Sequence, residues 1–290
     1  MRFTKVHGNG NDFVVIDNRE ALHTTEELSR FARLLCRRKF SIGADGILVV
    51  EKAPGGEVDF AMRIFNADGS EGEMCGNGAR ALARYAFEKK LTASRTGDMC
   101  FTTPAGLIRA RVEPPYAELD MGELDLVNEV FSDTLESCGL EFPFFFLTVG
   151  VPHCVLFMKD YDATDADLKV RIGRQVSHDF ARFPKGANVS FAQALSDDDA
   201  IAVTYERGVE NLTESCGTGC VAVAVAFAPF LRGRETGAPG AEPRTLRVHN
   251  PGGVNEVRLN FAPDNASCHA WLKGKTALVV EGEILGDAWL

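Results

Sequence analysis

The sequence predicts a mixed α/β (α+β) protein made of two similar, pseudo-symmetric halves. Short segments rich in β-branched and aromatic residues alternate with a few helical segments, and turn residues separate them. The chain has 290 residues, which is enough for two domains of ordinary size. The clearest sign of two halves is an internal repeat, because EMCGNGARALA at residues 73–83 returns as ESCGTGCVAVA at residues 214–224.

The repeat has a fixed offset of 141 residues, about half the chain. Glu73 and Cys75 correspond to Glu214 and Cys216, and both glycines of each CGxG turn match. A weaker echo relates GNGNDFVV at residues 8–15 to GVPHCVLF at residues 150–157. Chance similarity between two glycine-rich turns is the alternative, but six of the eleven positions are identical. We therefore expect a duplicated domain whose two halves face each other across a cleft.

The elements of the first half follow from local signals. The Thr24–Glu27 segment resembles a capping box and predicts a helix that runs to about Arg38. An alanine-rich helix is expected at Asn77–Lys89. Strands are expected at Val14–Asp17, Ile47–Glu51, Val58–Phe65, Ile108–Val112 and Ala117–Met121, with loops at Ala53–Glu57 and Glu113–Pro115.

The second half repeats this pattern. Helices are expected at Asp165–Asp179 and Thr218–Phe227. The clearest loop is RGRETGAPGAEP, Arg232–Pro243. The expected strands are Phe144–Val149, Cys154–Met158, Ala187–Phe191, Ile201–Tyr205, Leu246–His249, Val254–Phe261 and Leu278–Glu281.

Composition and charge narrow the possible partners. Hydrophobic residues make up 45% and charged residues 25%, as in folded soluble proteins. The net charge is -10 and no long basic run occurs, so nucleic acid is not an expected partner. The longest apolar run, Cys220–Leu231, is too short for a bilayer and contains Pro229. The N-terminus has no secretory pattern, so we expect a cytoplasmic protein with no membrane partner.

Two of the eight cysteines stand in unusual surroundings. The cysteines are widely scattered and none forms a CxxC pair, so neither a disulfide scaffold nor a zinc knuckle is indicated. Cys75 and Cys216 each lie in a CGxG turn directly before a helical segment. A helix N-terminus directs unpaired N–H groups and a positive dipole end at such a turn. This arrangement lowers a thiol pKa and binds anions such as carboxylates.

Two such cysteines could form a redox disulfide, bind a metal or act as an acid–base pair. Two thiols alone make a poor metal site, and no His/Cys cluster surrounds either turn. Redox partners usually lie close in sequence, which these do not. Acid–base work fits best, since inverting an α-carbon requires proton removal from one face and proton return to the other.

Six motifs together resemble the diaminopimelate epimerase family: HGNGNDFVVID, RIFNADGS, MCGNGAR, YERGVE, SCGTG and the late NPGG. They occur in the family's order along essentially the whole chain. The resemblance implies two domains, each a β-sheet wrapped around a central helix, with the active site in the interdomain cleft. The C-terminal segment would return to the first domain, giving domains at 1–118 plus 275–290 and at 119–274.

The resemblance also implies a reaction. Family members interconvert LL- and meso-diaminopimelate without pyridoxal phosphate or metal, in the supply of lysine and peptidoglycan precursors. By resemblance, Cys75 and Cys216 are the catalytic cysteines, and His153 and Glu206 tune them. The expected substrate contacts are Asn11, Asn66, Gly76, Asn77, Asn188, Glu206, Arg207, Gly217 and Thr218. Arg207 suits a carboxylate and Glu206 suits an ammonium group.

Some of these residues have simpler interpretations. Asn11 and Asn66 could make only turn contacts, Glu206 and Arg207 could form a surface ion pair, and His153 could be a core histidine. Two positions also depart from many members, which have Asn where this chain has Val151 and Gln where it has Gly46. Both departures affect contacts to the distal end of the substrate.

Other functions remain open from the residues alone. One is a racemase of the same fold that acts on proline, hydroxyproline, histidine or another amino acid. A second is a thiol redox protein using Cys75 and Cys216, and a third is a non-enzymatic small-molecule binding protein. The resemblance further implies a homodimer, with Trp271 at or near its interface.

Overall fold

The computed structural model describes residues 1–290 except 54, 57, 93, 129, 229–242 and 290. The chain divides into two compact units. Unit 1 is Met1–Asp120 with Lys273–Leu290, and unit 2 is Met121–Leu272. The expected loop at 232–243 lies, apart from its last residue, outside the described residues. No helix of the described ranges is long and apolar enough to cross a membrane.

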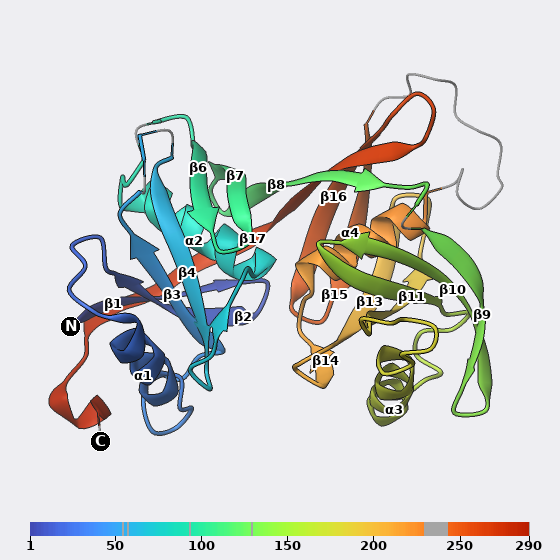
Figure 1. Ribbon diagram of the computed structural model, residues 1–290, viewed down its shortest axis with the longest axis horizontal. Helices are drawn as coiled ribbons and strands as arrows, with labels where there is room; N and C mark the ends of the chain where they lie inside the picture. The colour runs from blue at the N-terminus through green and yellow to red at the C-terminus, as the bar shows by residue number, and fades with distance from the viewer. Residues whose placement is uncertain (54, 57, 93, 129, 229–242, 290) are drawn as a thin grey trace. The chain divides into compact units, whose positions relative to one another are not determined.

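Unit 1 wraps a sheet around one helix (Figure 1). Its helices are α1 (Thr25–Leu35) and the central α2 (Gly76–Glu88), and a 3-10 helix (Gly286–Trp289) lies near the C-terminus. Its strands are β1 (Arg2–Gly8), β2 (Asn11–Asp17), β3 (Gly46–Glu51), β4 (Phe60–Asn66), β5 (Glu71–Gly72), β6 (Asp98–Thr103), β7 (Gly106–Glu113) and parts of β8 (Tyr116–Asp125) and β17 (Ser267–Glu283).

The strand pairing of unit 1 closes on itself. The ladders run in the order β17, β1, β2, β3, β4, β6, β7, β8, and β8 pairs back with β17. Helix α2 contacts β1, β2, β3, β4 and β7 from inside this sheet. Its residues Asn77–Ala83 are all buried, which is why the segment is rich in alanine and glycine.

Unit 2 is built in the same way around α4 (Gly217–Ala226). Helix α4 contacts β10, β11, β12, β13, β15 and β16, and helix α3 (Ala166–Ser177) packs outside. The strands are β9 (Phe131–Ser137), β10 (Leu140–Val149), β11 (Val151–Phe157), β12 (Asn188–Ala194), β13 (Asp199–Glu206), β14 (Asn211–Thr213), β15 (Arg244–Asn250) and β16 (Gly253–Phe261), completed by parts of β8 and β17.

The two units share one topology, so the expected two-domain α/β fold with a central helix in each domain is confirmed. In unit 1, β1 is antiparallel to β2, β2 is parallel to β3, β3 is antiparallel to β4, and β4 is parallel to β6. In unit 2, strands β10, β11, β12, β13 and β15 repeat this sequence of pairings. Short strands β5 and β14 occupy equivalent places directly before the central helices.

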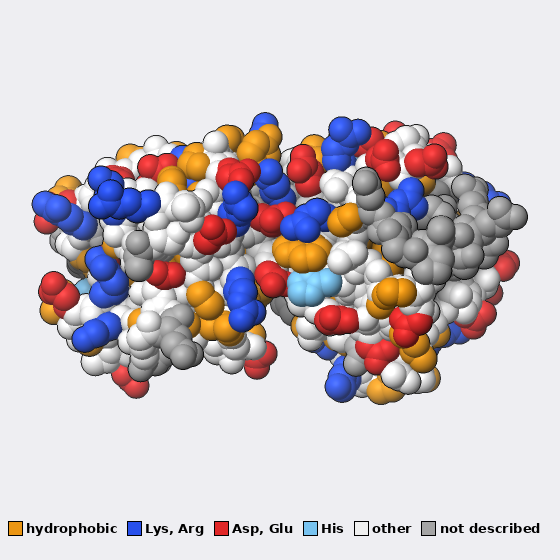
Figure 2. Space-filling model, turned by 90° about the horizontal axis from the view of Figure 1, so that it is seen from above, with side chains coloured by type: hydrophobic (Ala, Val, Ile, Leu, Met, Phe, Trp, Pro, Cys, Tyr) orange, Lys and Arg blue, Asp and Glu red, His pale blue; other side chains and the backbone are white. Residues whose placement is uncertain are grey.

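The structure also contains strands that the sequence did not predict. These are β1, β5, β6, β9, β14 and the first part of β17. Strand β9 has no hydrophobic run because most of its residues are exposed, and only Leu135 and Ser137 are buried. Residues 114–115 form the expected turn, but Glu113 belongs to β7. Acidic, basic and hydrophobic side chains are interspersed on the face drawn in Figure 2.

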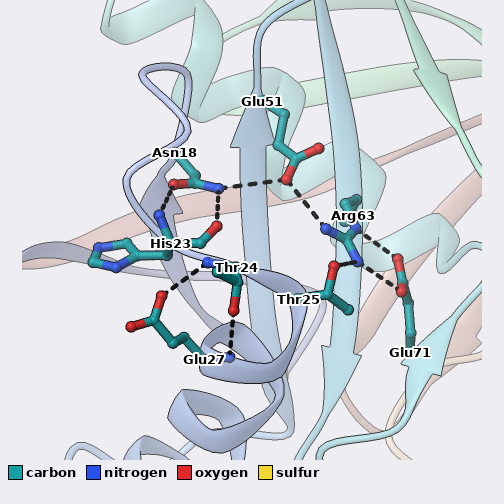
Figure 3. A network of polar contacts seen from close by, with 8 residues as sticks. All are labelled: Asn18, His23, Thr24, Thr25, Glu27, Glu51, Arg63 and Glu71. Carbon is teal, nitrogen blue, oxygen red and sulfur yellow. Dashed lines mark hydrogen bonds and ion pairs between the residues drawn. The ribbon is translucent and has the colours of Figure 1, made fainter.

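A polar network centred on Arg63 ties β5 to the body of unit 1 (Figure 3). The Arg63 guanidinium donates to both carboxylate oxygens of Glu71, at 2.7 and 2.8 Å. It also donates to Glu51 at 3.2 Å and to the Thr25 hydroxyl at 3.0 Å. A two-bond fork of this kind fixes direction as well as distance. The network therefore holds the short strand that leads into the first CGxG turn.

Replacement of Arg63 by Met is expected to lower the free energy of unfolding by about 1–2 kcal/mol, because Glu51 and Glu71 would lose a shared, mostly buried cation. Urea unfolding measures the change. The control is Arg111→Met, which breaks a pair with Glu113 in which both side chains are 57% exposed, and its expected cost is below about 0.5 kcal/mol. Equal costs for the two substitutions would contradict the assignment of Arg63.

Candidate active site

The expected site residues lie at one end of the sheet in each unit. In unit 1, Asn11 begins β2, Asn66 ends β4, and Cys75 immediately precedes α2. The register brings these ends together, since Phe13 pairs with Gly46 and Gly46 pairs with Asn66. In unit 2, equivalent ladders pair His153 with Asn188 and Val189 with Tyr205, next to Glu206. Each unit therefore gathers its own group of the expected site residues at one end of its sheet.

Cys75 is the N-cap residue of α2. Its backbone is extended, at φ -138° and ψ 118°, and its sulfur accepts a hydrogen bond from the Gly78 N–H at 3.4 Å. A sulfur at this position satisfies one of the backbone donors that every helix start leaves unpaired. The side chain is partly exposed. The structure thus places a solvent-accessible thiol at a helix N-terminus, the setting expected from the CGxG pattern.

Three asparagines were expected at or near this turn. The Cys75 thiol lies 3.5 Å from the Asn11 side-chain oxygen. Asn77 is buried, and its side-chain oxygen accepts from the fully buried Arg80 guanidinium at 2.6 Å. Asn66 is exposed and donates to the Ser70 hydroxyl at 3.0 Å. Asn11 is therefore in direct contact with the thiol, while Asn66 also makes the turn contact that was its simpler interpretation.

Cys216 is the N-cap residue of α4, with an extended backbone at φ -109° and ψ 111°. It is buried, with 6% of its surface exposed. The second glycine of this CGxG turn is required by close packing. A Cβ atom at Gly219 would lie 2.8 Å from the Thr204 hydroxyl and 3.2 Å from the Cys216 sulfur. Only glycine fits at this position, between Thr204 of β13 and Cys216.

A buried histidine reaches the second turn through a hydroxyl. His153 is fully buried on β11, and its Nε2 lies 3.0 Å from the Thr218 hydroxyl. The same hydroxyl lies 3.6 Å from the Cys216 sulfur. Burial lowers the pKa of His153 to about 3, and the positive charge of Arg207 adds to the effect. At neutral pH the ring is therefore uncharged.

Glu206 and Cys216 form an acidic pair at the end of β13. Burial raises the pKa of the Glu206 carboxyl, and hydrogen bonds from Thr213 and from the Cys216 thiol oppose the rise. Burial and the neighbouring Glu206 charge raise the pKa of the Cys216 thiol well above its usual range. The lowered thiol pKa expected from the CGxG pattern is therefore wrong for Cys216, because burial outweighs the helix N-terminus. A carboxyl group and a thiol in contact, both with raised pKa values, are suited to exchange a proton.

Among the described residues, Arg207 forms no ion pair with Glu206, although a surface ion pair was the simpler interpretation of both residues. The Arg207 backbone N–H donates to the Asn188 side-chain oxygen at 2.9 Å. Its guanidinium donates to the Lys185 carbonyl, and the residue is exposed. Asn188 is buried and thus holds the backbone that carries Arg207.

The structure shows what surrounds Gly46 and Val151, the two positions that depart from the family pattern. Gly46 begins β3, and a Cβ atom there would lie 2.5 Å from the Phe65 carbonyl oxygen. This backbone therefore has no room for a glutamine side chain without a shift. Val151 begins β11 and pairs with Val149 across Gly150, which has a φ of 68°.

Sequence reasoning missed three residues at these turns. Asp45 binds Asn11, Arg80 binds Asn77, and Thr213 binds Glu206. Two of them could have been found from their place in the sequence. Asp45 directly precedes Gly46, which departs from the family pattern, and Arg80 is the last residue of the CGNGAR motif. In the parts of the chain that the structure describes, no group of three or more His, Cys, Asp or Glu is placed to hold a metal ion.

Comparison with known proteins decides the family. The family model described as diaminopimelate epimerase matches residues 3–127 and 145–274. The chain belongs to the diaminopimelate epimerase family. The diaminopimelate epimerase of Archaeoglobus fulgidus is 42% identical over 236 residues, covering 77% of this chain and 80% of that protein. The Methanocella arvoryzae diaminopimelate epimerase is 36% identical over 297 residues, covering 98% and 96%.

Solved structures share the fold at low sequence identity. A Bacillus anthracis phenazine biosynthesis protein of the PhzF family superposes with a TM-score of 0.72 at 15% identity, over 98% of this chain and 99% of that one. A probable proline racemase from Agrobacterium radiobacter gives a TM-score of 0.68 at 15% identity, over 98% and 93%. The fold is therefore common to several chemistries, and the family assignment depends on the closer relatives.

His153 should make the stability of the protein depend on pH. Its folded-state pKa is lowered from 6.5 to about 3, so between these values the unfolded chain binds a proton that the folded chain does not. The free energy of unfolding should therefore fall as the pH falls through this window, by up to about 1.4 kcal/mol per pH unit for one proton. His153→Gln should show a shallower fall in urea unfolding from pH 7 to 4. Parallel wild-type and variant profiles would rule this role out.

Proposed function

We propose that this protein interconverts LL- and meso-diaminopimelate by a cofactor-free mechanism in which Cys75 and Cys216 are the two acid–base groups. The observation that carries the proposal is the matched pair of N-cap cysteines, one on each central helix, in a member of the diaminopimelate epimerase family. The proposed pathway is the synthesis of lysine and peptidoglycan precursors. The proposed location is the cytoplasm.

The proposed reaction moves one proton in each direction. One cysteine, as thiolate, removes the α-hydrogen and becomes a thiol, and the electron pair left on the α-carbon delocalises into the carboxylate. The other cysteine, as thiol, then gives its proton to the opposite face of the same carbon and becomes the thiolate. Inversion therefore needs both cysteines to act on the same substrate carbon.

Helix N-termini would stabilise the intermediate. The carboxylate gains charge as the proton leaves, and backbone N–H groups at Gly76, Asn77, Gly217 and Thr218 are the proposed donors. Such donors are set in place by the helices before the reaction begins. They therefore need no reorganisation when the charge develops.

Glu206 and His153 have proposed roles around Cys216. Glu206 is the proposed proton acceptor for the Cys216 thiol, because the two groups are in contact and burial raises the carboxyl pKa. His153 is the proposed orienting group, since its uncharged ring contacts the Thr218 hydroxyl beside the sulfur. Both roles concern the protonation of the cysteine and do not replace it as the base.

A substrate with an amino acid at each end needs partners at its unreacted end. Arg207 is the proposed carboxylate contact there, with Asn11, Asn66 and Asn188 as further polar contacts. Arg207 is exposed, so its guanidinium is available to a ligand. A substrate panel tests this choice: turnover of LL-diaminopimelate with no turnover of proline, hydroxyproline or histidine is expected. Preference for a one-ended amino acid would contradict it.

Substitution of either Cys75 or Cys216 by Ala should reduce epimerisation by at least about 10²–10⁴-fold, because each face loses its only proposed base or acid. The folded content, followed by circular dichroism, should stay unchanged. The matched control is Cys154→Ala, which removes a buried thiol with no proposed role in the reaction. Near-normal turnover by a folded Cys75 or Cys216 variant would overturn the two-base assignment.

We also propose a homodimer with Trp271 at or near its interface. Trp271 lies half-buried on β17, its ring 4.3 Å from the His269 ring and 3.8 Å from the Arg258 guanidinium carbon. Tryptophan is enriched at protein interfaces because it buries a large area with few rotatable bonds.

Sedimentation should show a dimer for the wild type at micromolar concentration and weaker association for Trp271→Ala. Phe40→Ala is the control for loss of an exposed aromatic side chain, since Phe40 is 76% exposed. A monomeric wild type would reject the dimer. A dimer equally strong in Trp271→Ala would reject the role of Trp271.

A further inference from the structure

An acidic residue outside the expected site controls the amide beside Cys75. Asp45 lies directly before β3, and one of its carboxylate oxygens accepts from the Asn11 side-chain N–H at 2.6 Å. The same oxygen accepts from the Asp12 backbone N–H at 3.1 Å. The other oxygen accepts from the Arg38 guanidinium at 2.9 Å. Asp45 is therefore held by three donors.

These contacts decide which way the Asn11 amide points. A carboxylate can only accept hydrogen bonds, so the NH₂ group of Asn11 must face Asp45. The amide oxygen must then face the other way, where the Cys75 sulfur lies 3.5 Å distant. That oxygen can also only accept. In this arrangement the hydrogen between the two side chains belongs to the thiol.

We propose that Asp45 is a positioning residue that locks the Asn11 amide with its oxygen toward Cys75, so that Cys75 is held as the protonated thiol in the resting enzyme. The inference rests on the proposed acid–base role of Cys75. It specifies the protonation state in which Cys75 begins the reaction, because a hydrogen bond accepted from the neutral form of a group favours the neutral form. Cys75 then begins as the proton donor of the pair.

Opposing influences act on the same sulfur. The Gly78 N–H, 3.4 Å from the sulfur, and the start of α2 favour the thiolate, whereas the Asn11 oxygen favours the thiol. Asp12 pairs with Lys5 and Arg38, so the two nearby carboxylates are matched by two cations. The titratable and charged groups on the elements around this turn include Lys5, His7, Asp12, Arg38, Asp45, Arg63, Glu71, Glu73 and Arg80.

Loss of Asp45 should let the amide turn. In Asp45→Ala the Asn11 NH₂ group has no carboxylate to face, and its N–H can donate to the sulfur and stabilise the thiolate. Loss of the Asp45 negative charge would by itself lower the thiol pKa. Asp12→Asn removes a negative charge beside the same Arg38 while leaving the Asp45 acceptor in place. Asp12→Asn is therefore the matched control for charge.

The test follows the pH dependence of Cys75 alkylation by iodoacetamide in the full-length protein, resolved by mass spectrometry of the Cys75 peptide. Asp45→Ala should move the midpoint down by about 0.5–1 pH unit, which is about 3- to 10-fold faster alkylation below the midpoint. Asp12→Asn should move it down by less than half as much. Asp45→Ser, whose shorter side chain does not reach Asn11, should repeat the effect if Asp45→Ala does not fold.

A double-variant cycle separates the effect of the Asn11 amide orientation from the effect of a less rigid turn. Asn11→Ala removes the amide, so Asp45→Ala should cause no further shift of the midpoint in that background. An unchanged midpoint in folded Asp45→Ala, or an undiminished Asp45→Ala shift without Asn11, would overturn the proposal. Thiol reactivity does not depend on turnover, so failure to convert diaminopimelate would reject the proposed function without altering this readout.

Discussion

The structure depends on the way each central helix begins. A helix enclosed by a sheet begins with backbone N–H groups that need partners, and both central helices have a cysteine in the N-cap position. In the described part of the chain, the Cys216 side chain makes no hydrogen bond to the start of its helix. Cys75 caps α2 through its sulfur, and Cys216 occupies the same place on α4. The surrounding strand ends then supply the polar side chains that contact each sulfur.

The two cysteine turns share a backbone plan but differ in chemistry. The Cys75 turn is partly exposed and meets a neutral amide held by Asp45. The Cys216 turn is buried and meets a carboxyl group and, through Thr218, a neutral histidine. The two units share one topology, but different neighbours place the two identical side chains in different electrostatic surroundings.

The sequence was informative where local chemistry determines structure. The Thr24–Glu27 capping box is present at the start of α1, and the CGxG repeat marks the start of both central helices. The family and the type of enzyme expected from the motifs are confirmed by the relatives. Strands such as β9, whose residues are mostly exposed, carried no hydrophobic pattern and were missed. Asp45 was missed because its contact with Asn11 joins residues 34 positions apart, which only the β2–β3 ladder brings together.

The most direct test of the two-base account uses LL-diaminopimelate in heavy water, with substrate and product separated at low conversion. Two different bases place a solvent deuteron at the inverted carbon of the product, while recovered substrate keeps its original hydrogen at early times. The account predicts deuterated meso product and largely unlabelled LL substrate. Product that retains the original hydrogen, or no conversion at all, would contradict it.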